Sequence, residues 1–162
     1  MTKIDRDKLS VAAEFAVASE LGRRNIYAQP TYGDQKRTDL LIFGTAGTPL
    51  LIEVKGKQSR QWPNCLGIPN SRWILVLVDF AGKSETERPD FYILTAQDWL
   101  DFVRAEIKRH RKGGRTVELG PDQVPVWPDQ VKNGKVYRGM GVEVRHVSQL
   151  RECWWKVVDA LK

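Results

Sequence analysis

The sequence has few of the residues that build disulfide frameworks, zinc sites or nucleophilic triads. Only two of its 162 residues are cysteine and only two are histidine. Cys65 and Cys153 lie far apart without Cys-x-x-Cys spacing, so they predict neither a disulfide nor a structural zinc ion. We expect Cys153 in the core and Cys65 in a loop. His110 lies in a basic run, where a solvated helix end is the expected role.

Long apolar runs are also missing. No stretch is long enough to span a membrane, and the residues after Met1 do not form a signal-peptide core. We therefore expect a cytoplasmic protein with no membrane partner. The length suits one domain over 1–162, with a core at 9–112, an irregular arm at 113–145 and a C-terminal helix at 147–161.

Basic residues exceed acidic ones. Twenty-six Lys and Arg against 20 Asp and Glu give a formal net charge of +6. This balance fits a phosphate-bearing partner such as DNA. Many basic proteins bind no nucleic acid, so an interaction protein whose charge is incidental stays open as an alternative.

Residues 36–57 predict a β-hairpin. Two runs rich in Leu, Ile, Phe and Val flank turn-forming residues at 44–48, and charged residues stand at the far ends of both runs. With a five-residue turn, Phe43 pairs with Pro49.

This register gathers charged side chains on adjacent strands. Asp39 falls across from Glu53, and Glu53 and Lys55 share a face because side chains alternate along a strand. Carboxylates on neighbouring strands repel each other and need a neutralising partner. Mg²⁺ can be that partner, because two carboxylates and several waters are enough to bind it. The alternative is that Asp39 caps its strand while Glu53 and Lys55 form a surface ion pair.

The ordered set resembles the PD-(D/E)xK nuclease superfamily. Thr-Asp at 38–39 stands where that family has Pro-Asp or Thr-Asp, and Glu-Val-Lys at 53–55 stands at its (D/E)xK. Glu14, inside a mostly apolar segment, matches the glutamate that many members carry on their first helix. The resemblance covers residues 9–95.

The resemblance implies a restriction endonuclease-like α/β fold, in which a mixed central β-sheet is flanked by helices. It also implies hydrolysis of DNA phosphodiester bonds with Mg²⁺, for which we expect Mn²⁺ to substitute. Asp39 and Glu53 would bind the metal with help from the backbone carbonyl of Val54. Lys55 would orient water and phosphate, and Glu14 would serve a second metal site or a supporting role.

Side chains near the motif are expected to contact nucleic acid. A mixture of cations and an aromatic ring suits phosphate contact and base stacking. The six candidates are Lys36, Arg37, Lys57, Arg60, Trp62 and Arg72. The alternatives are that the cations are simply solvated and that Trp62 packs its own loop against the core.

Pattern and turn residues predict the remaining elements. We expect helices at 9–21 and from the N-cap Thr95 to Gly113, strands at 25–29, 73–80, 90–94, 116–119 and 135–138, and a loop or a short helix and turn at 56–72. Glu20 is expected at the surface. The arm could contact DNA, form a dimer contact or cover the sheet.

Two further interpretations stay open. The chain could be a non-catalytic DNA-binding or partner-binding module that kept a nuclease-like fold. It could also act as a homodimer or with a partner subunit, since cutting both strands of a duplex favours a dimer.

Overall fold

The computed structural model describes residues 3–31, 38–44 and 47–162. Within these ranges no helix is both long enough and apolar enough to cross a membrane. In chain order the elements are α1 (Arg6–Gly22), β1 (Ala28–Pro30), β2 (Leu40–Phe43), β3 (Pro49–Lys57), β4 (Gln61–Cys65), β5 (Trp73–Asp79), β6 (Asp90–Thr95), α2 (Ala96–Lys112), β7 (Glu118–Leu119), β8 (Pro125–Lys132), β9 (Lys135–Arg138), β10 (Met140–Glu143), α3 (Val144–Val147), the 3₁₀ helix η1 (Ser148–Leu150) and α4 (Trp155–Ala160).

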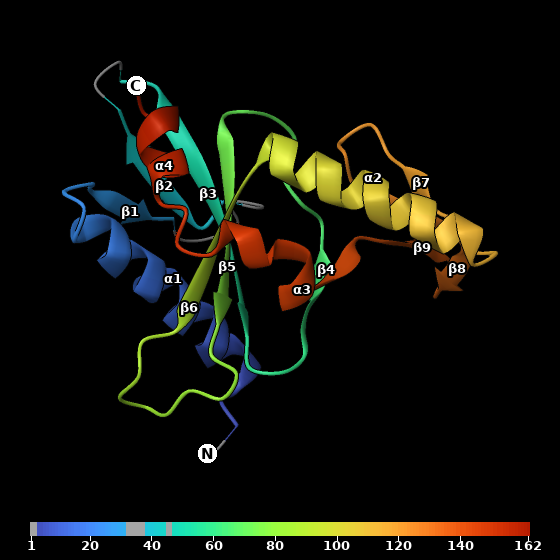
Figure 1. Ribbon diagram of the computed structural model, residues 1–162, viewed down its shortest axis with the longest axis horizontal. Coiled ribbons are helices and arrows are strands. Elements are labelled where there is room, and N and C mark those ends of the chain that lie inside the picture. The colour runs from blue at the N-terminus through green and yellow to red at the C-terminus, as the bar shows by residue number, and fades with distance from the viewer. Residues whose placement is uncertain (1–2, 32–37, 45–46) are drawn as a thin grey trace.

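A five-stranded sheet in the order β1-β2-β3-β5-β6 forms the centre of the fold (Figure 1). β3 and β5 run parallel, and the other neighbouring strands run antiparallel. Helices flank this sheet. The α/β class and the mixed central sheet that the sequence predicts are therefore confirmed.

The central strand β5 is buried on both faces, as its continuous apolar run predicts. Ile74 and Val76 pack into a hydrophobic cluster with α1, whereas Leu75 and Leu77 pack into a second cluster with α2. Side chains alternate along a strand, so the two clusters lie on opposite faces of the sheet. Because both faces of the sheet are covered, polar side chains can form a site only at the ends of the strands and at the edges of the sheet.

The hairpin and α2 form as predicted. Phe43 pairs with Pro49, although the turn residues 45–46 lie outside the described part of the chain. Thr95 and Asp98 form a reciprocal capping box at the start of α2, with the Asp98 carboxylate accepting from the Thr95 amide at 2.7 Å.

The loop or short helix and turn expected at 56–72 is wrong in part, because the last two residues of β3 and all of β4 lie there. β4 pairs with β10, a strand far downstream, and its sequence alone has little strand character. Cys65 is fully buried in this strand rather than lying in a loop, whereas Cys153 is only partly buried. Long-range pairing thus decides the conformation of this segment.

The arm at 113–145 is more ordered than its proline and glycine content predicts. β7, β8 and β9 form a small sheet near the C-terminal end of α2 (Figure 1). Val117, Trp127, Met140 and Val142 pack into the hydrophobic cluster that contains α2. Of the three roles expected for the arm, covering the sheet is the one these contacts support.

The single helix predicted at 147–161 is wrong, because α3, η1 and α4 replace it. Leu150 packs into the cluster with α2, whereas Trp154 packs into the cluster with α1. The chain therefore crosses the edge of the sheet at β6, where the Glu152 amide donates to the Phe91 carbonyl at 2.9 Å. A continuous helix cannot follow that path.

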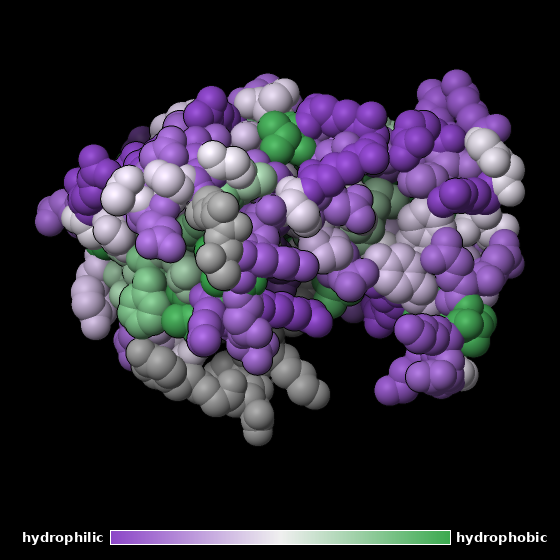
Figure 2. All heavy atoms as spheres, turned by 90° about the horizontal axis from the view of Figure 1, so that it is seen from below, coloured by the Kyte–Doolittle hydropathy of each residue, from purple (hydrophilic) through white to green (hydrophobic). Residues whose placement is uncertain are grey.

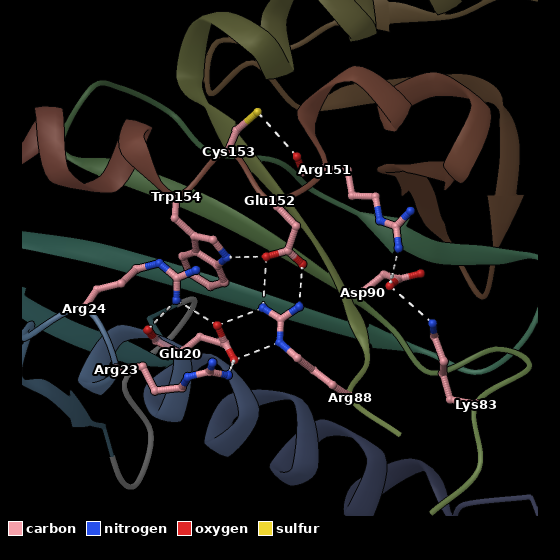
Figure 3. A network of polar contacts seen from close by, with 10 residues as sticks. All are labelled: Glu20, Arg23, Arg24, Lys83, Arg88, Asp90, Arg151, Glu152, Cys153 and Trp154. Atoms are coloured by element: carbon pink, nitrogen blue, oxygen red, sulfur yellow. Dashed lines mark hydrogen bonds and ion pairs between the residues drawn. The ribbon is translucent and has the colours of Figure 1, made fainter. Parts of the chain in front are cut away.

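An ionic network holds this crossing to α1 (Figure 3). Arg88 donates to Glu20 at 2.9 Å and to Glu152 at 2.8 Å, and Arg24 donates to Glu20 at 2.7 Å. Glu20 is 4% exposed, which corrects the surface position expected for it. Hydrogen bonding from Arg88 is the main cause that lowers the pKa of Glu20 to about 2.

Candidate active site

Asp39 lies where the ladder between β2 and β3 ends. The last paired residues are Leu40 and Ile52. Beyond them the Asp39 amide donates to the Ile52 carbonyl at 3.0 Å, and the Asp39 carboxylate accepts from the Val54 amide at 2.6 Å. The short side chain of Asp39 thus replaces the next main-chain partner of β3.

The backbone of Val54 contributes a second oxygen at this point. In a strand, the N–H and C=O of one residue point to the same side, which is why opposite residues can exchange both bonds. The Val54 amide points to Asp39, so the Val54 carbonyl also faces the β2 side, past the last paired residues. Carboxylate and carbonyl oxygens therefore stand together at the end of the ladder.

Glu53 and Lys55 form an ion pair on the next positions of β3. The Lys55 ammonium lies 3.3 Å from a carboxylate oxygen of Glu53. Glu53 is only 2% exposed, whereas the Lys55 side chain is 39% exposed. The alternative of a surface ion pair is therefore wrong for Glu53. A carboxylate is costly to bury, so its position here calls for positive charge nearby.

The neighbouring thiol is not a nucleophile. Burial raises the pKa of Cys65 to about 12, and the opposite charges of Lys55 and Glu53 act on it in opposite directions. A thiol with such a pKa stays protonated at neutral pH. The charged groups of this site are therefore carboxylates and an ammonium.

Helix α1 brings Glu14 to the same place. A Cβ at Gly56 would lie 3.0 Å from the side chain of the helix residue that precedes Glu14, so α1 crosses β3 closely just after Lys55. Burial, and then the charge of Asp39, raise the pKa of Glu14, while the Ser10 hydroxyl and Lys55 act the other way. Glu14 is thus within electrostatic range of both Asp39 and Lys55.

The oxygen donors of this site suit a hard divalent cation. Asp39, Glu53 and the Val54 carbonyl offer oxygen only, which Mg²⁺ prefers. In the parts of the chain that the structure describes, no group of three or more His, Cys, Asp and Glu side chains is spaced to hold a metal. A cation here would therefore depend on the backbone carbonyl and water as well as on carboxylates.

A cavity of about 720 Å³ opens beside this site. Lys55 lines it together with Lys3 and Arg6 from the segment before and at the start of α1. The Gln58 side chain fixes that segment, since its amide accepts from the Ile4 N–H at 2.8 Å and donates to the Ile4 carbonyl at 2.6 Å. The sequence does not predict that Lys3 and Arg6 lie near β3, because no local pattern indicates this contact.

Two residues expected to contact nucleic acid are buried instead. Trp62 is 0% exposed and donates to the Val78 carbonyl at 3.0 Å. Lys57 is 4% exposed, lies 2.6 Å from Asp79 and stacks its ammonium over the Trp62 ring. Both side chains are thus held by partners inside the protein. Both expectations are corrected, because Trp62 lies in β4, which pairs with β10, and Lys57 lies at the end of β3 opposite Asp79 of β5.

The other expected contacts differ in position. Arg60 is exposed and lies 3.2 Å from Glu143. Arg72 is exposed but precedes β5, at the end of the parallel pair remote from Lys55. Lys36 and Arg37 lie outside the described residues.

Comparison with known proteins gives no assignment. No protein-family model, curated protein or solved structure matches the chain. Any function must therefore follow from the chemistry of the site.

Proposed function

We propose that the protein is a metal-dependent endonuclease of the PD-(D/E)xK type with a restriction endonuclease-like core, and that it hydrolyses DNA phosphodiester bonds with an activated water. One observation carries the proposal. The Asp39 carboxylate accepts from the backbone amide of Val54, the residue between Glu53 and Lys55 in the sequence, and the side chains of Glu53 and Lys55 form an ion pair. This arrangement sets two carboxylates, a carbonyl and an ammonium around the end of one ladder.

Asp39, Glu53 and the Val54 carbonyl would hold Mg²⁺, and we expect Mn²⁺ to substitute. When bound, such an ion lowers the pKa of a coordinated water and offsets negative charge on the phosphate. The protein groups supply hard oxygen donors on a rigid strand.

Lys55 orients the reactants. Its side chain is partly exposed, and it lines the cavity while its ammonium stays beside Glu53. An ammonium has three donors, so it can hold Glu53 and still donate to a water or a phosphate oxygen. Glu14 has a supporting role. Its raised pKa means that its carboxyl group titrates closer to neutral pH than an ordinary glutamate does.

A non-catalytic DNA-binding or partner-binding module is the second candidate. Asp39 and Lys55 both already have partners within the protein, and the described residues offer no three-residue metal cluster. These contacts also suit a site that only maintains the fold. Such a module should bind DNA in EDTA and never cut it.

Cleavage of a supercoiled plasmid and of a short branched duplex, each with Mg²⁺, Mn²⁺ or EDTA, tests the proposal. Lys55→Ala should lower the rate about 100-fold or more, since one electrostatic donor at a reacting centre contributes on this scale. Lys162→Ala is the matched control, because it also removes a lysine paired with a nearby carboxylate, here Asp159 at 2.6 Å. Cutting by Lys55→Ala at the wild-type rate would sink the assignment.

A further inference from the structure

A second cavity continues the basic lining away from Lys55. It has a volume of about 780 Å³ and shares Ser59 and Gln61 with the first cavity, so the two lie next to each other. Figure 2 views the side on which the N-terminal segment and the β3–β4 connection lie, and there hydrophilic side chains cover most of the surface. We call the two adjacent cavities the basic groove; the cations that line it are Lys3, Arg6, Lys55, the buried Lys57, Arg60, Arg109 and Arg115.

The cations of the basic groove come from distant parts of the chain. They belong to the N-terminal segment, to the strands β3 and β4 with their connection, and to the C-terminal end of α2. Among the described residues that line the groove, Asp5 and Glu143 are the carboxylates. Gathering like charges in this way is unfavourable unless an anion binds there.

Two arginines of the groove, Arg60 and Arg115, are exposed and only weakly held by other residues of the protein. The Arg60 side chain is 79% exposed, and its partner Glu143 lies at 3.2 Å. Arg115 is exposed and forms no ion pair with any residue the structure describes. Exposed ion pairs contribute little free energy, so a phosphate can displace Glu143 from Arg60. The planar guanidinium group also suits bidentate contact with phosphate.

We propose that the basic groove binds the phosphate backbone of DNA beyond the bond that is cut, with Arg60 and Arg115 as the outlying contacts. The choice of DNA rests on the proposed function. The two adjacent cavities favour a polyanion, because a single phosphate would occupy one of them and leave the cations of the other without a phosphate.

Salt-dependent binding of a fluorescent duplex, measured by anisotropy in EDTA so that no cutting occurs, tests this. The double variant Arg60→Ala/Arg115→Ala should bind at least about 10-fold more weakly, and the slope of log K against log salt should fall by about 2, since each phosphate contact contributes about 0.9. The control is Arg23→Ala/Arg138→Ala, which removes the same charge from exposed arginines outside the groove. Its slope should match that of the wild type.

Glu143→Gln gives a test of opposite sign. It keeps the shape of the side chain but releases Arg60 and removes negative charge from the groove. Binding should tighten a few-fold. Because the expected change is a gain, this variant complements the loss expected for the double variant.

The outcomes separate the groove from the nuclease. Equal slopes for the two double variants, an unchanged affinity for Glu143→Gln, or no salt-sensitive binding by the wild type would overturn the groove. Wild-type protein that never cuts, while the groove variants bind as expected, supports the groove and removes the nuclease. If the wild type cuts normally and the two double variants have equal salt slopes, the nuclease is supported and the groove is excluded.

Discussion

Two glutamates on the same helix have opposite electrostatic environments. Glu20, near the C-terminal end of α1, has a pKa lowered to about 2, chiefly because Arg88 donates to it. Glu14, less than two turns earlier, has a raised pKa because it is partly buried and lies near Asp39. The helix supplies the same residue type twice, and the partners decide what each one does.

At Glu20 the charges are neutralised within the chain. Arg88 lies between Glu20 and Glu152, and Arg24 also donates to Glu20 (Figure 3). At Glu14 the charge of another carboxylate, Asp39, has a larger effect on the pKa than that of Lys55, and a bound cation would relieve the repulsion between the two carboxylates. The charges around Glu20 are thus balanced within the protein and maintain the fold. The charges around Glu14 favour the binding of a cation.

Asp39→Asn should have the largest effect on activity, and it tests the proposed ion site beside Glu14. Asparagine can still accept from the Val54 amide, so the fold should persist. Cleavage should fall roughly 100-fold or more, because a bound cation supplies several kcal/mol of charge stabilisation. Plasmid cutting and the Mg²⁺-induced rise in melting temperature should both be lost, as metal bound only to the folded state raises stability by mass action.

The control for Asp39→Asn is its melting temperature without metal. A value close to that of the wild type, with cutting lost, assigns the carboxylate to ion binding. Normal cutting by Asp39→Asn, with an unchanged response to Mg²⁺, would mean that Asp39 only caps β3.

Glu20→Gln should have the next largest effect, on stability alone. It should cost about 2 kcal/mol, less than the roughly 3–5 kcal/mol of a fully buried pair, because Arg24 and Arg88 are partly exposed. The melting temperature should fall by about 4–8 °C. The pKa of Glu20 is depressed, so its contribution is present above the ordinary pKa near 4.5 and is lost as pH falls from there toward 2.

Urea unfolding of the wild type and Glu20→Gln across this pH range checks the window. The difference between the two proteins should be constant near neutral pH and should shrink below pH 4.5. Cleavage at a temperature where both proteins are folded should be equal. A loss of cutting would show that the two ends of α1 are coupled, contrary to the comparison.

Local patterns predict most of the framework of the site. The two apolar runs with a short turn predict the register that pairs Phe43 with Pro49 and hence the position of Asp39 relative to Glu53. The apolar segment containing Glu14 predicts α1. These features depend on side-chain periodicity and turn length, which are local properties of the chain.

Contacts between distant segments are what the sequence does not predict. Trp62 and Lys57 follow the motif closely, yet both are buried, Trp62 where β4 pairs with β10 and Lys57 opposite Asp79 of β5. Arg88 gives no local sign that it will cover Glu20, and the crossing near Glu152 interrupts a helix whose periodicity is otherwise good. Each of these outcomes requires a partner far away in the sequence.

Glu14→Gln should have the smallest effect on stability, and its sign should be opposite to that of Glu20→Gln. Because the pKa of Glu14 is raised, its charged form is disfavoured in the folded state at neutral pH. Removing the charge should therefore stabilise the protein by about 0.5 kcal/mol, a shift of roughly 1–2 °C. Below the ordinary pKa of 4.5 the gain should disappear, because Glu14 is then protonated in both states.

The same change should lower cleavage by about 10-fold or more if Glu14 supports the ion, as groups that support metal ligands do elsewhere. A more stable protein that cuts more slowly is the behaviour expected of a residue kept for function rather than for folding. Thermal melts at several pH values and plasmid cutting measure the two effects in one preparation. If Glu14→Gln loses stability at neutral pH as Glu20→Gln does, both glutamates serve the fold and the contrast along α1 is wrong.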